Sequence, residues 1–398
     1  MKFLFKFRRP KGYIDFILPE IKSLANLYSM LPNQRVFASM KNISQEREKL
    51  RKHRMQKLEL ESQEVAHKIL KRSILIDSMT SIHSEINGTQ QIPIVGPEIL
   101  EQNKSKTFRI DMTLTNRDSS YQGVSHFQKL KLIKQFYRNN DTLGKKFDLD
   151  SPEVIYHIHF DYQHNKTYLG QRYESDYYYK KYRLTNRPFR GFTCTKAELA
   201  FLMCNLAELP SDTNCVVYDP FVGSASTLLS AAHLGANTIG SDLAYKTMFG
   251  KPKLNKDQKN VFTNFDHYGL PRPQLFLSDF SRSRMRREIF DHIICDPPYG
   301  IQAASKVFNG SLRIKSSRNN QYSYKDVIDD LLAKSYHWLK PDGTLVFLYY
   351  IDKDIPHKFP YDFVTRFPSY PGMILEEFCE NPLIKSRVRY AVKFRFLK

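Results

Sequence analysis

The segment IICDPPYGI, residues 293–301, places an acidic residue, two prolines and a tyrosine directly after an apolar run. Consecutive prolines restrict the backbone, so the carboxylate of Asp296 and the carbonyl beside Pro297 can be held ready to accept both hydrogens of an exocyclic amine. These bonds would turn the nitrogen lone pair toward a methyl donor. The ring of Tyr299 can stack on a base removed from its helix. The pattern predicts methylation of a base amine, and the alternative is a proline-rich turn without chemistry.

A second stretch, VVYDPFVGSASTLLSAAHLGANTIGSDL at residues 216–243, predicts a strand ending at Asp219, a turn, a helix and a strand ending at Asp242. In parallel sheets ligands bind at the carboxyl ends of strands, where a carboxylate can hold both hydroxyls of a ribose. Gly223 allows close approach of the backbone. A dinucleotide site needs Gly-x-Gly-x-x-Gly, and an acidic loop repels phosphate. The stretch therefore favours a cationic cofactor such as S-adenosylmethionine, the alternative being an ordinary strand–turn–helix.

Between these stretches, LFLSDFSR (residues 275–282) predicts a third strand followed by Asp279. A carboxylate at this place can meet the amino group of an adenine. It can equally well cap the N-terminus of a helix, a common role of Asp. The sequence leaves both interpretations open.

The elements that must position these residues alternate between helix and strand from Ala197 onward, which predicts a parallel sheet covered on both faces. The first half is predicted to mix the two types. Its expected strands are residues 3–7, 108–114 and 153–162. Its expected helices are residues 15–30, 46–75 and 125–138, and residues 87–106 are expected to form a loop.

Composition limits the class of protein. The chain has 398 residues, 41% of them hydrophobic, which is enough to bury real cores and suggests two or three domains. Its net charge of +20 favours a polyanionic partner, nucleic acid before membrane. The five cysteines have no Cys-x-x-Cys spacing, so neither a disulfide framework nor a metal site is expected. No run reaches the ~18 apolar residues of a membrane span, and we expect a soluble, cytoplasmic protein.

Several stretches together resemble one family, the catalytic subunits of eukaryotic tRNA guanosine-10 N2-methyltransferases. They include FRRPKGYIDFILPEIKSLANLY (7–28), AHKILKRSILIDSM (66–79), GKKFDLDSPEVIY (144–156), RPFRGFTCTKAELAFLMCNLA (187–207), DPFVGSAS, DPPYGI and the closing RVRYAVKF. The resemblance implies an α/β protein with a Rossmann-like methyltransferase sheet in its C-terminal half, preceded by an α+β region that contains a tRNA-binding THUMP domain. The implied divisions are residues 1–80 (ferredoxin-like), 81–170 (THUMP), 171–190 (linker) and 191–398 (methyltransferase).

The resemblance also implies roles for individual residues. The methionine end of S-adenosylmethionine would contact Asp219, Phe221 and Gly223, the ribose Asp242, and the adenine Asp279 and Phe280. The target guanine would be held by Asp296, Pro297 and Tyr299, and Thr193 and Glu198 would line the same pocket. The sequence departs from the family at Ala225, where a glycine is usual, and at Cys194 and Thr195, where Ser and Met are expected. Ala225 would cost on the order of 1 kcal/mol if its φ is positive.

Two partners are expected. The first is tRNA, and the loop at residues 305–323 carries Lys306, Arg313, Lys315 and Arg318 with no acidic residue. This loop is predicted to contact the RNA backbone, or it is simply a solvated loop. The second partner, implied by the resemblance alone, is a small zinc-binding activator subunit that forms a heterodimer with the chain.

Two alternative functions stay open at this point. Asp-Pro-Pro-Tyr serves an adenine N6 amine as well as a guanine N2 amine, so the chain could methylate adenine in RNA or DNA. The chain could also be a catalytically inert tRNA-binding subunit, for which Ala225 is the one supporting feature.

Overall fold

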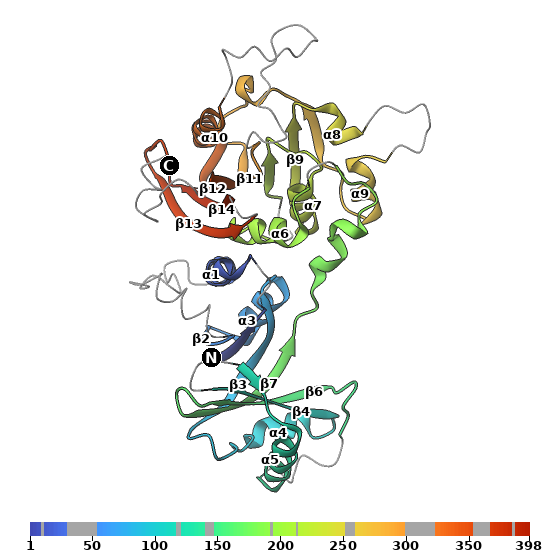
Figure 1. The fold of residues 1–398 in the computed structure, drawn as a ribbon, viewed down its shortest axis with the longest axis vertical. Coiled ribbons are helices and arrows are strands. Elements are labelled where there is room, and N and C mark those ends of the chain that lie inside the picture. Colours follow the sequence, from blue (N-terminus) through green and yellow to red (C-terminus); the bar gives the residue numbers. More distant parts are fainter. Residues whose placement is uncertain are drawn as a thin grey trace. The chain divides into compact units, whose positions relative to one another are not determined.

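The computed structural model describes residues 1–8, 12–29, 54–116, 121–139, 147–191, 194–211, 214–250, 259–298, 323–352, 367–383 and 387–398. They form two compact units, Met1–Ile21 with Tyr28–Asp176 and Lys22–Leu27 with Tyr177–Lys398. Each unit contains one seven-stranded sheet (Figure 1). In these described ranges, no helix is both long enough and apolar enough to cross a membrane.

The sheet of the first unit has the strand order β2-β1-β3-β7-β6-β4-β5. Its strands are β1 (Lys2–Phe7), β2 (Met55–Glu59), β3 (Ile76–Asn87), β4 (Phe108–Thr115), β5 (Tyr121–Gly123), β6 (Val154–Asp161) and β7 (Lys166–Glu174). β4 and β6 run parallel, and every other neighbouring pair is antiparallel. Helices α4 (Pro97–Asn103) and α5 (His126–Asn139) lie together beside β4 and β6 (Figure 1). Their side of the sheet buries Phe108, Tyr156 and Phe136.

The prediction of one helix over residues 46–75 is wrong for the part that the structure describes. Residues Met55–Glu59 form strand β2, and the helix is only α3 (Gln63–Arg72). β2 forms because it pairs with β1, with Leu58 opposite Phe3, and such long-range pairing leaves little trace in local sequence. Ser62 then starts α3 by accepting a hydrogen bond from the N–H of Val65 at 3.2 Å.

The predicted loop at residues 87–106 is also partly wrong, because it contains α4. Pro97 stands at the beginning of that helix and Glu98 in its first turn, both of which favour a helix start. The boundary placed at residue 80 lies inside β3. The segment 171–190 contains the end of β7 and two 3-10 helices, Tyr178–Tyr182 and Leu184–Asn186.

The second unit contains the predicted Rossmann-like sheet, in the order β10-β9-β8-β11-β12-β14-β13. Its strands are β8 (Val216–Asp219), β9 (Asn237–Asp242), β10 (Gln274–Leu277), β11 (Phe290–Cys295), β12 (Leu339–Asp352), β13 (Met373–Pro382) and β14 (Arg387–Phe396). The first five strands in the sheet order are parallel, and β14 is antiparallel to both of its neighbours. The chain reverses its direction of travel across the sheet between β8 and β11, which is where such sheets bind ligands.

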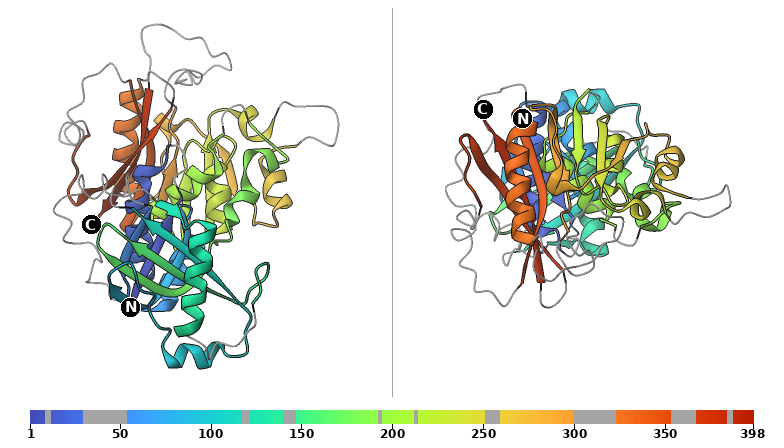
Figure 2. Two further views of the ribbon diagram at one scale, coloured as in Figure 1. Left: turned by 60° about the horizontal axis from the view of Figure 1, so that its bottom comes forward. Right: turned by 90° about the horizontal axis from the view of Figure 1, so that it is seen from above.

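Helices cover both faces of this sheet, as predicted. On one face α10 (Tyr324–Trp338) packs Leu331 and Trp338 against Phe290 and Phe347, and Figure 2 shows α10 running along the last strands. On the other face α6 (Ala197–Leu206) packs against α7 (Ser226–His233). α7 can approach because β9 has Gly240 beneath it, where a Cβ atom would lie 2.8 Å from Leu228.

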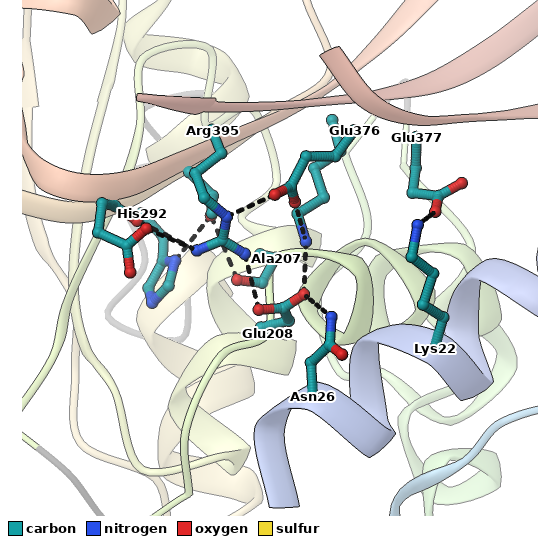
Figure 3. A network of polar contacts seen from close by, with 11 residues as sticks. Lys22, Asn26, Ala207, Glu208, His292, Glu376, Glu377 and Arg395 are labelled. Carbon is teal, nitrogen blue, oxygen red and sulfur yellow. Dashed lines mark hydrogen bonds and ion pairs between the residues drawn. The ribbon is translucent and has the colours of Figure 1, made fainter. Parts of the chain in front are cut away.

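A network of buried charges joins the end of α6 to the antiparallel strands (Figure 3). The ammonium of Lys393, which is 1% exposed, lies 2.7 Å from a carboxylate oxygen of Glu208 and 2.8 Å from one of Glu376. Arg395 contacts the same two carboxylates, each at 2.7 Å. Burial would raise the pKa of Glu376, but the charges of Lys393 and Arg395 lower it to about 2. Two cations and two anions therefore neutralise one another.

Candidate active site

Four aspartates follow four neighbouring strands of the second sheet. Asp219 and Asp242 end β8 and β9, Asp296 directly follows β11, and Asp279 comes two residues after β10. The four strands are parallel and adjacent in the order β10-β9-β8-β11. The carboxyl ends of parallel strands meet at one edge of a sheet, so this topology gathers all four residues at the predicted site.

Asp219 is the most deeply enclosed of the four, with 2% of its surface exposed. Its Oδ1 accepts a hydrogen bond from the backbone N–H of Phe221 at 2.9 Å, and its Oδ2 accepts one from the hydroxyl of Thr227. Burial is the main cause that raises the pKa of Asp219 to about 7, and the nearby carboxylates of Asp296 and Asp242 add to the rise. A cation among these carboxylates would favour their ionised forms.

Asp242 is tied to the turn that follows β8. Its Oδ2 accepts a hydrogen bond from the N–H of Gly223 at 2.9 Å and its Oδ1 one from Ala244 at 2.8 Å. Burial raises the pKa of Asp242, and these backbone bonds oppose the rise. Gly223 has φ +50 and Ala225 has φ +58. Two residues of the turn therefore have left-handed backbone. Gly223 adopts this conformation easily, whereas Ala225 is strained in it because it has a Cβ atom.

Asp296 is fixed through both of its carboxylate oxygens. Oδ1 accepts a hydrogen bond from the hydroxyl of Tyr350 at 2.9 Å, and Oδ2 accepts one from the hydroxyl of Thr195 at 3.2 Å. Arg389 donates to the Tyr350 hydroxyl at 3.5 Å and to the side chain of Asn381 at 2.6 Å. Burial raises the pKa of Asp296, while the positive charge of Arg389 and the two hydrogen bonds lower it.

Asp279 has the capping role that the sequence left open. Its Oδ1 accepts bonds from the N–H and the hydroxyl of Ser281, at 3.0 and 2.7 Å, at the start of the 3-10 helix Phe280–Arg282. The cap also positions Phe280, whose ring centre lies 4.6 Å from that of Phe221. These two rings bring the loops after β8 and β10 together.

The remaining predicted residues fall into two groups. Glu198, in the first turn of α6, forms an ion pair with Arg183 at 3.1 Å, and no contact among the described residues links it to the four aspartates. Pro297 is buried directly after Asp296. The others lie outside the described residues: Thr193, Tyr299, Lys306, Arg313, Lys315 and Arg318.

Three residues around Asp296 were missed in the sequence: Thr195, Tyr350 and Arg389. Thr195 was noted only because the resembling family is expected to have Met at that position. Tyr350 could have been found by its position near the end of β12, the strand beside β11. The other site residues were predicted from strand ends in the same way. Arg389 comes from an antiparallel strand, and the register that places its side chain near Tyr350 cannot be read from the local sequence.

Together these residues suit one kind of ligand better than others. Asp219, Asp242 and Asp296 bring three carboxylates to the turn after β8, and negative groups of this kind repel a phosphate. Asp242 keeps lone pairs that can accept ribose hydroxyls, since a carboxylate has about four acceptor positions. A cationic nucleoside fits this donor set, and beside it Asp296 is oriented to accept hydrogens from an amine.

Comparison with known proteins points in the same direction. Residues 185–319 match the family described as RMKL-like, methyltransferase domain. A tRNA (guanine(10)-N(2))-methyltransferase from Bos taurus, TRMT11, is 26% identical over 425 residues, covering 97% of this chain and 86% of that protein. The Saccharomyces cerevisiae tRNA (guanine(10)-N(2))-methyltransferase is 27% identical over 335 residues, covering 73% of each.

Among solved structures, TrmN from Thermus thermophilus aligns over 100% of both chains, with 16% identity and a TM-score of 0.46. The matched residues include all four aspartates and the DPPY segment. Residues 185–319 of the second unit are thus similar to an RMKL-like methyltransferase domain, and the chain is similar to tRNA (guanine(10)-N(2))-methyltransferases over nearly its whole length.

Proposed function

We propose that this chain is the catalytic subunit of a tRNA methyltransferase that transfers a methyl group from S-adenosylmethionine to N2 of guanosine 10. The observation that carries the proposal is the position of Asp296. It directly follows β11, with both oxygens held by Tyr350 and Thr195, and its charge is close enough to Asp219 to help raise the pKa of that residue. The tRNA and the guanine are those named for the relatives that align with the chain.

The cofactor would be held by the residues of the first two strand ends. Asp242 would accept the ribose hydroxyls, and the turn at Phe221 and Gly223 would enclose the methionine end. Phe280 would pack against the adenine beside Asp279. When bound, S-adenosylmethionine supplies an electrophilic methyl group on a positively charged sulfur. The buried carboxylates and the positively charged sulfur would stabilise each other, because a nearby positive charge favours the ionised form of a carboxylate.

Asp296 performs the part of the reaction that the protein must supply. One of its oxygens, with a neighbouring backbone carbonyl, would accept the hydrogens of the guanine amine and fix the direction of the nitrogen lone pair. As N2 takes the methyl group it becomes cationic and strongly acidic, and Asp296 accepts the proton that it loses. A carboxylate is basic enough for this step. Orientation in a site that excludes water therefore contributes more than base strength.

The remaining parts of the tRNA would contact the first unit and the loop after DPPY. We assign a THUMP domain to the first unit on the resemblance noted above. Lys306, Arg313, Lys315 and Arg318 would contact the RNA backbone. Neutralising these four side chains should lower both tRNA affinity and the steepness of its salt dependence. Unchanged binding would remove this loop from the interface.

A small zinc-binding activator is the second proposed partner, and strand β10 is where we place it. β10 ends one side of the sheet and exposes Phe276 and Leu277, at 37% and 55%. After the neighbouring β9, Leu243 and Tyr245 are exposed at 37% and 49%. These are exposed apolar side chains on and beside an edge strand, and a partner can cover such an edge by adding a strand.

The test is a methyltransferase assay on unmodified tRNA transcripts with the chain and its activator, followed by mass spectrometry of the nucleosides. We expect N2-methylguanosine from the wild-type chain and none from Asp296→Asn, which keeps the size of the side chain but removes its negative charge. N6-methyladenosine would show an adenine enzyme instead. No product, with tRNA bound normally, would show an inert tRNA-binding subunit.

A further inference from the structure

The segment between β10 and β11 carries an exposed row of arginines. Residues 281–289 read SRSRMRREI, and Arg282, Arg284, Arg286 and Arg287 are all exposed. Met285 and Ile289 on the same segment pack instead against the hydrophobic core under α10. The segment therefore packs its apolar residues against the core and leaves its arginines exposed to solvent. We call these four residues the arginine row.

The arginine row is anchored at both ends. The N–H groups of Glu288 and Ile289 donate to the backbone carbonyls of His337 and Trp338 at 3.0 and 2.9 Å. At the other end, the ammonium of Lys334 donates to the carbonyl of Ser281 at 3.1 Å and lies 4.5 Å from the ring centre of Phe280. A segment fixed in this way presents its charges with little further loss of entropy on binding.

The charge of the arginine row is not neutralised locally. Within the ranges that the structure describes, no carboxylate lies within ion-pair distance of any of the four arginines. The nearby acidic groups are taken by lysines, since Asp330 pairs with Lys334 at 2.9 Å and Glu288 with Lys398 at 3.7 Å. Arg287 is close enough to help lower the pKa of Lys398, for which burial is the larger cause. This surface therefore has a net positive charge.

The arginine row starts at the candidate active site. Arg282 is the last residue of the 3-10 helix that Asp279 caps, and Phe280 of the same helix touches Phe221 in the turn after β8. A macromolecule that delivers one nucleotide to Asp296 must extend beyond the site. The row leads away from the site along one side of α10.

We propose that the arginine row binds the phosphate backbone of the tRNA whose guanosine enters the site. This inference rests on the proposed function. The guanidinium group suits phosphate because it donates two parallel hydrogen bonds and remains charged. All four arginines fall within six consecutive residues of one anchored segment, so they can contact neighbouring phosphates of one RNA strand. An acidic protein surface would match the charge, but the tRNA is the polyanion that the proposed function brings to this part of the molecule.

The experiment compares two double variants of the full-length chain with equal loss of charge. The test variant is Arg284→Gln with Arg286→Gln. The control is Arg272→Gln with Lys325→Gln, whose side chains are already paired with Asp266 and Asp329. Binding of the tRNA transcript is measured across a range of salt concentrations, and methylation under single-turnover and steady-state conditions.

In the test variant we expect weaker tRNA binding, a salt slope reduced by about 2, and a higher KM for tRNA with nearly unchanged kcat. The control should keep the slope of the wild-type chain. An unchanged slope in the test variant, or an equal loss in both variants, would overturn the proposal.

Failure of this inference differs from failure of the proposed function. If the wild-type chain forms N2-methylguanosine and the test variant binds tRNA normally, only the role of the arginine row is wrong. If the test variant binds tRNA normally but no longer co-purifies with the activator, the row is a protein interface. If the wild-type chain forms no N2-methylguanosine on tRNA that it binds, the proposed function is wrong, whatever the salt slopes show.

Discussion

Each aspartate of the candidate site is oriented by bonds from its own surroundings. Backbone N–H groups hold Asp219 and Asp242, hydroxyl groups hold Asp296, and Asp279 is held by the residue that it caps. Groups that are fixed before a ligand arrives need no reorganisation during the reaction. The chain therefore supplies orientation at four strand ends, and a transfer reaction at a sulfonium methyl depends mainly on orientation.

The role of Tyr350 can be tested through the pH dependence of the rate. Asp296 must be ionised to accept a proton, and the hydroxyl of Tyr350 and the charge of Arg389 lower its pKa against the opposing effect of burial. Tyr350→Phe removes one donor, so the pKa of Asp296 should rise. The acidic limb of the rate profile should then move to higher pH. We expect the single-turnover rate to fall on the acidic side of the profile and to recover as the pH rises.

Tyr349→Phe provides the matched control, because Tyr349 is the next residue on β12 and its ring packs against Tyr324 and Phe367. Its rate profile should coincide with that of the wild-type chain. A Tyr350→Phe profile that falls equally at all pH values would show a structural role only, and Asp296 would then not depend on Tyr350 for its ionisation.

Ala225 allows a second test at the scale of single residues. Its left-handed backbone, φ +58, costs roughly 1–2 kcal/mol in a residue with a Cβ atom. Ala225→Gly relieves this strain but loses a buried methyl group and increases the freedom of the unfolded chain. These effects nearly cancel, so the free energy of unfolding should change by less than about 0.5 kcal/mol.

Ala231→Gly, in the interior of α7, supplies the comparison. It has no such strain to relieve and should destabilise the second unit by about 1–2 kcal/mol. Denaturant unfolding of the two variants gives both values. Equal destabilisation would show that Ala225 is not strained.

At the scale of elements, the five parallel strands of the second sheet were predictable because they alternate with helical segments along the sequence, whereas the antiparallel strands β13 and β14 were not predicted. The same rule placed Asp219, Asp242 and Asp296 at one edge. It failed for β2, whose sequence MQKLE lies in a charged region and forms a strand only by pairing with β1. Thr195 and Arg389 were missed for a related reason. Their contacts depend on segments and strand registers far away in the sequence.

The buried charge network around Lys393 makes its own prediction for these elements (Figure 3). Lys393→Met removes one of the two cations that face Glu208 and Glu376, so that Arg395 alone must balance two carboxylates. The expected loss is about 3–5 kcal/mol in the free energy of unfolding. Chemical denaturation monitored by circular dichroism measures it.

Lys325→Met serves as the exposed counterpart, since Lys325 pairs with Asp329 at the surface of α10. An exposed pair contributes about 0–1 kcal/mol. If the two variants lost stability equally, the interior network would have no more influence on folding than a surface pair.

At the scale of the whole molecule, the exposed apolar residues of β10 predict that activity depends on the proposed activator. Phe276→Ser with Leu277→Ser should abolish co-purification of the zinc-binding subunit and leave a chain with little methyltransferase activity. Ile374→Ser, at an exposed position on the opposite edge strand β13, is the control and should retain the partner. A fully active wild-type chain without any second subunit would contradict this prediction.

The most direct measurement of the central claim uses two tRNA transcripts that differ in one amine. Position 10 carries guanosine in one and inosine, which lacks the N2 amino group, in the other. The chain with its activator should transfer a methyl group from S-adenosylmethionine to the first transcript and none to the second, while it binds both. Equal incorporation into both transcripts would show that the methyl group goes elsewhere, and would contradict the role assigned to Asp296.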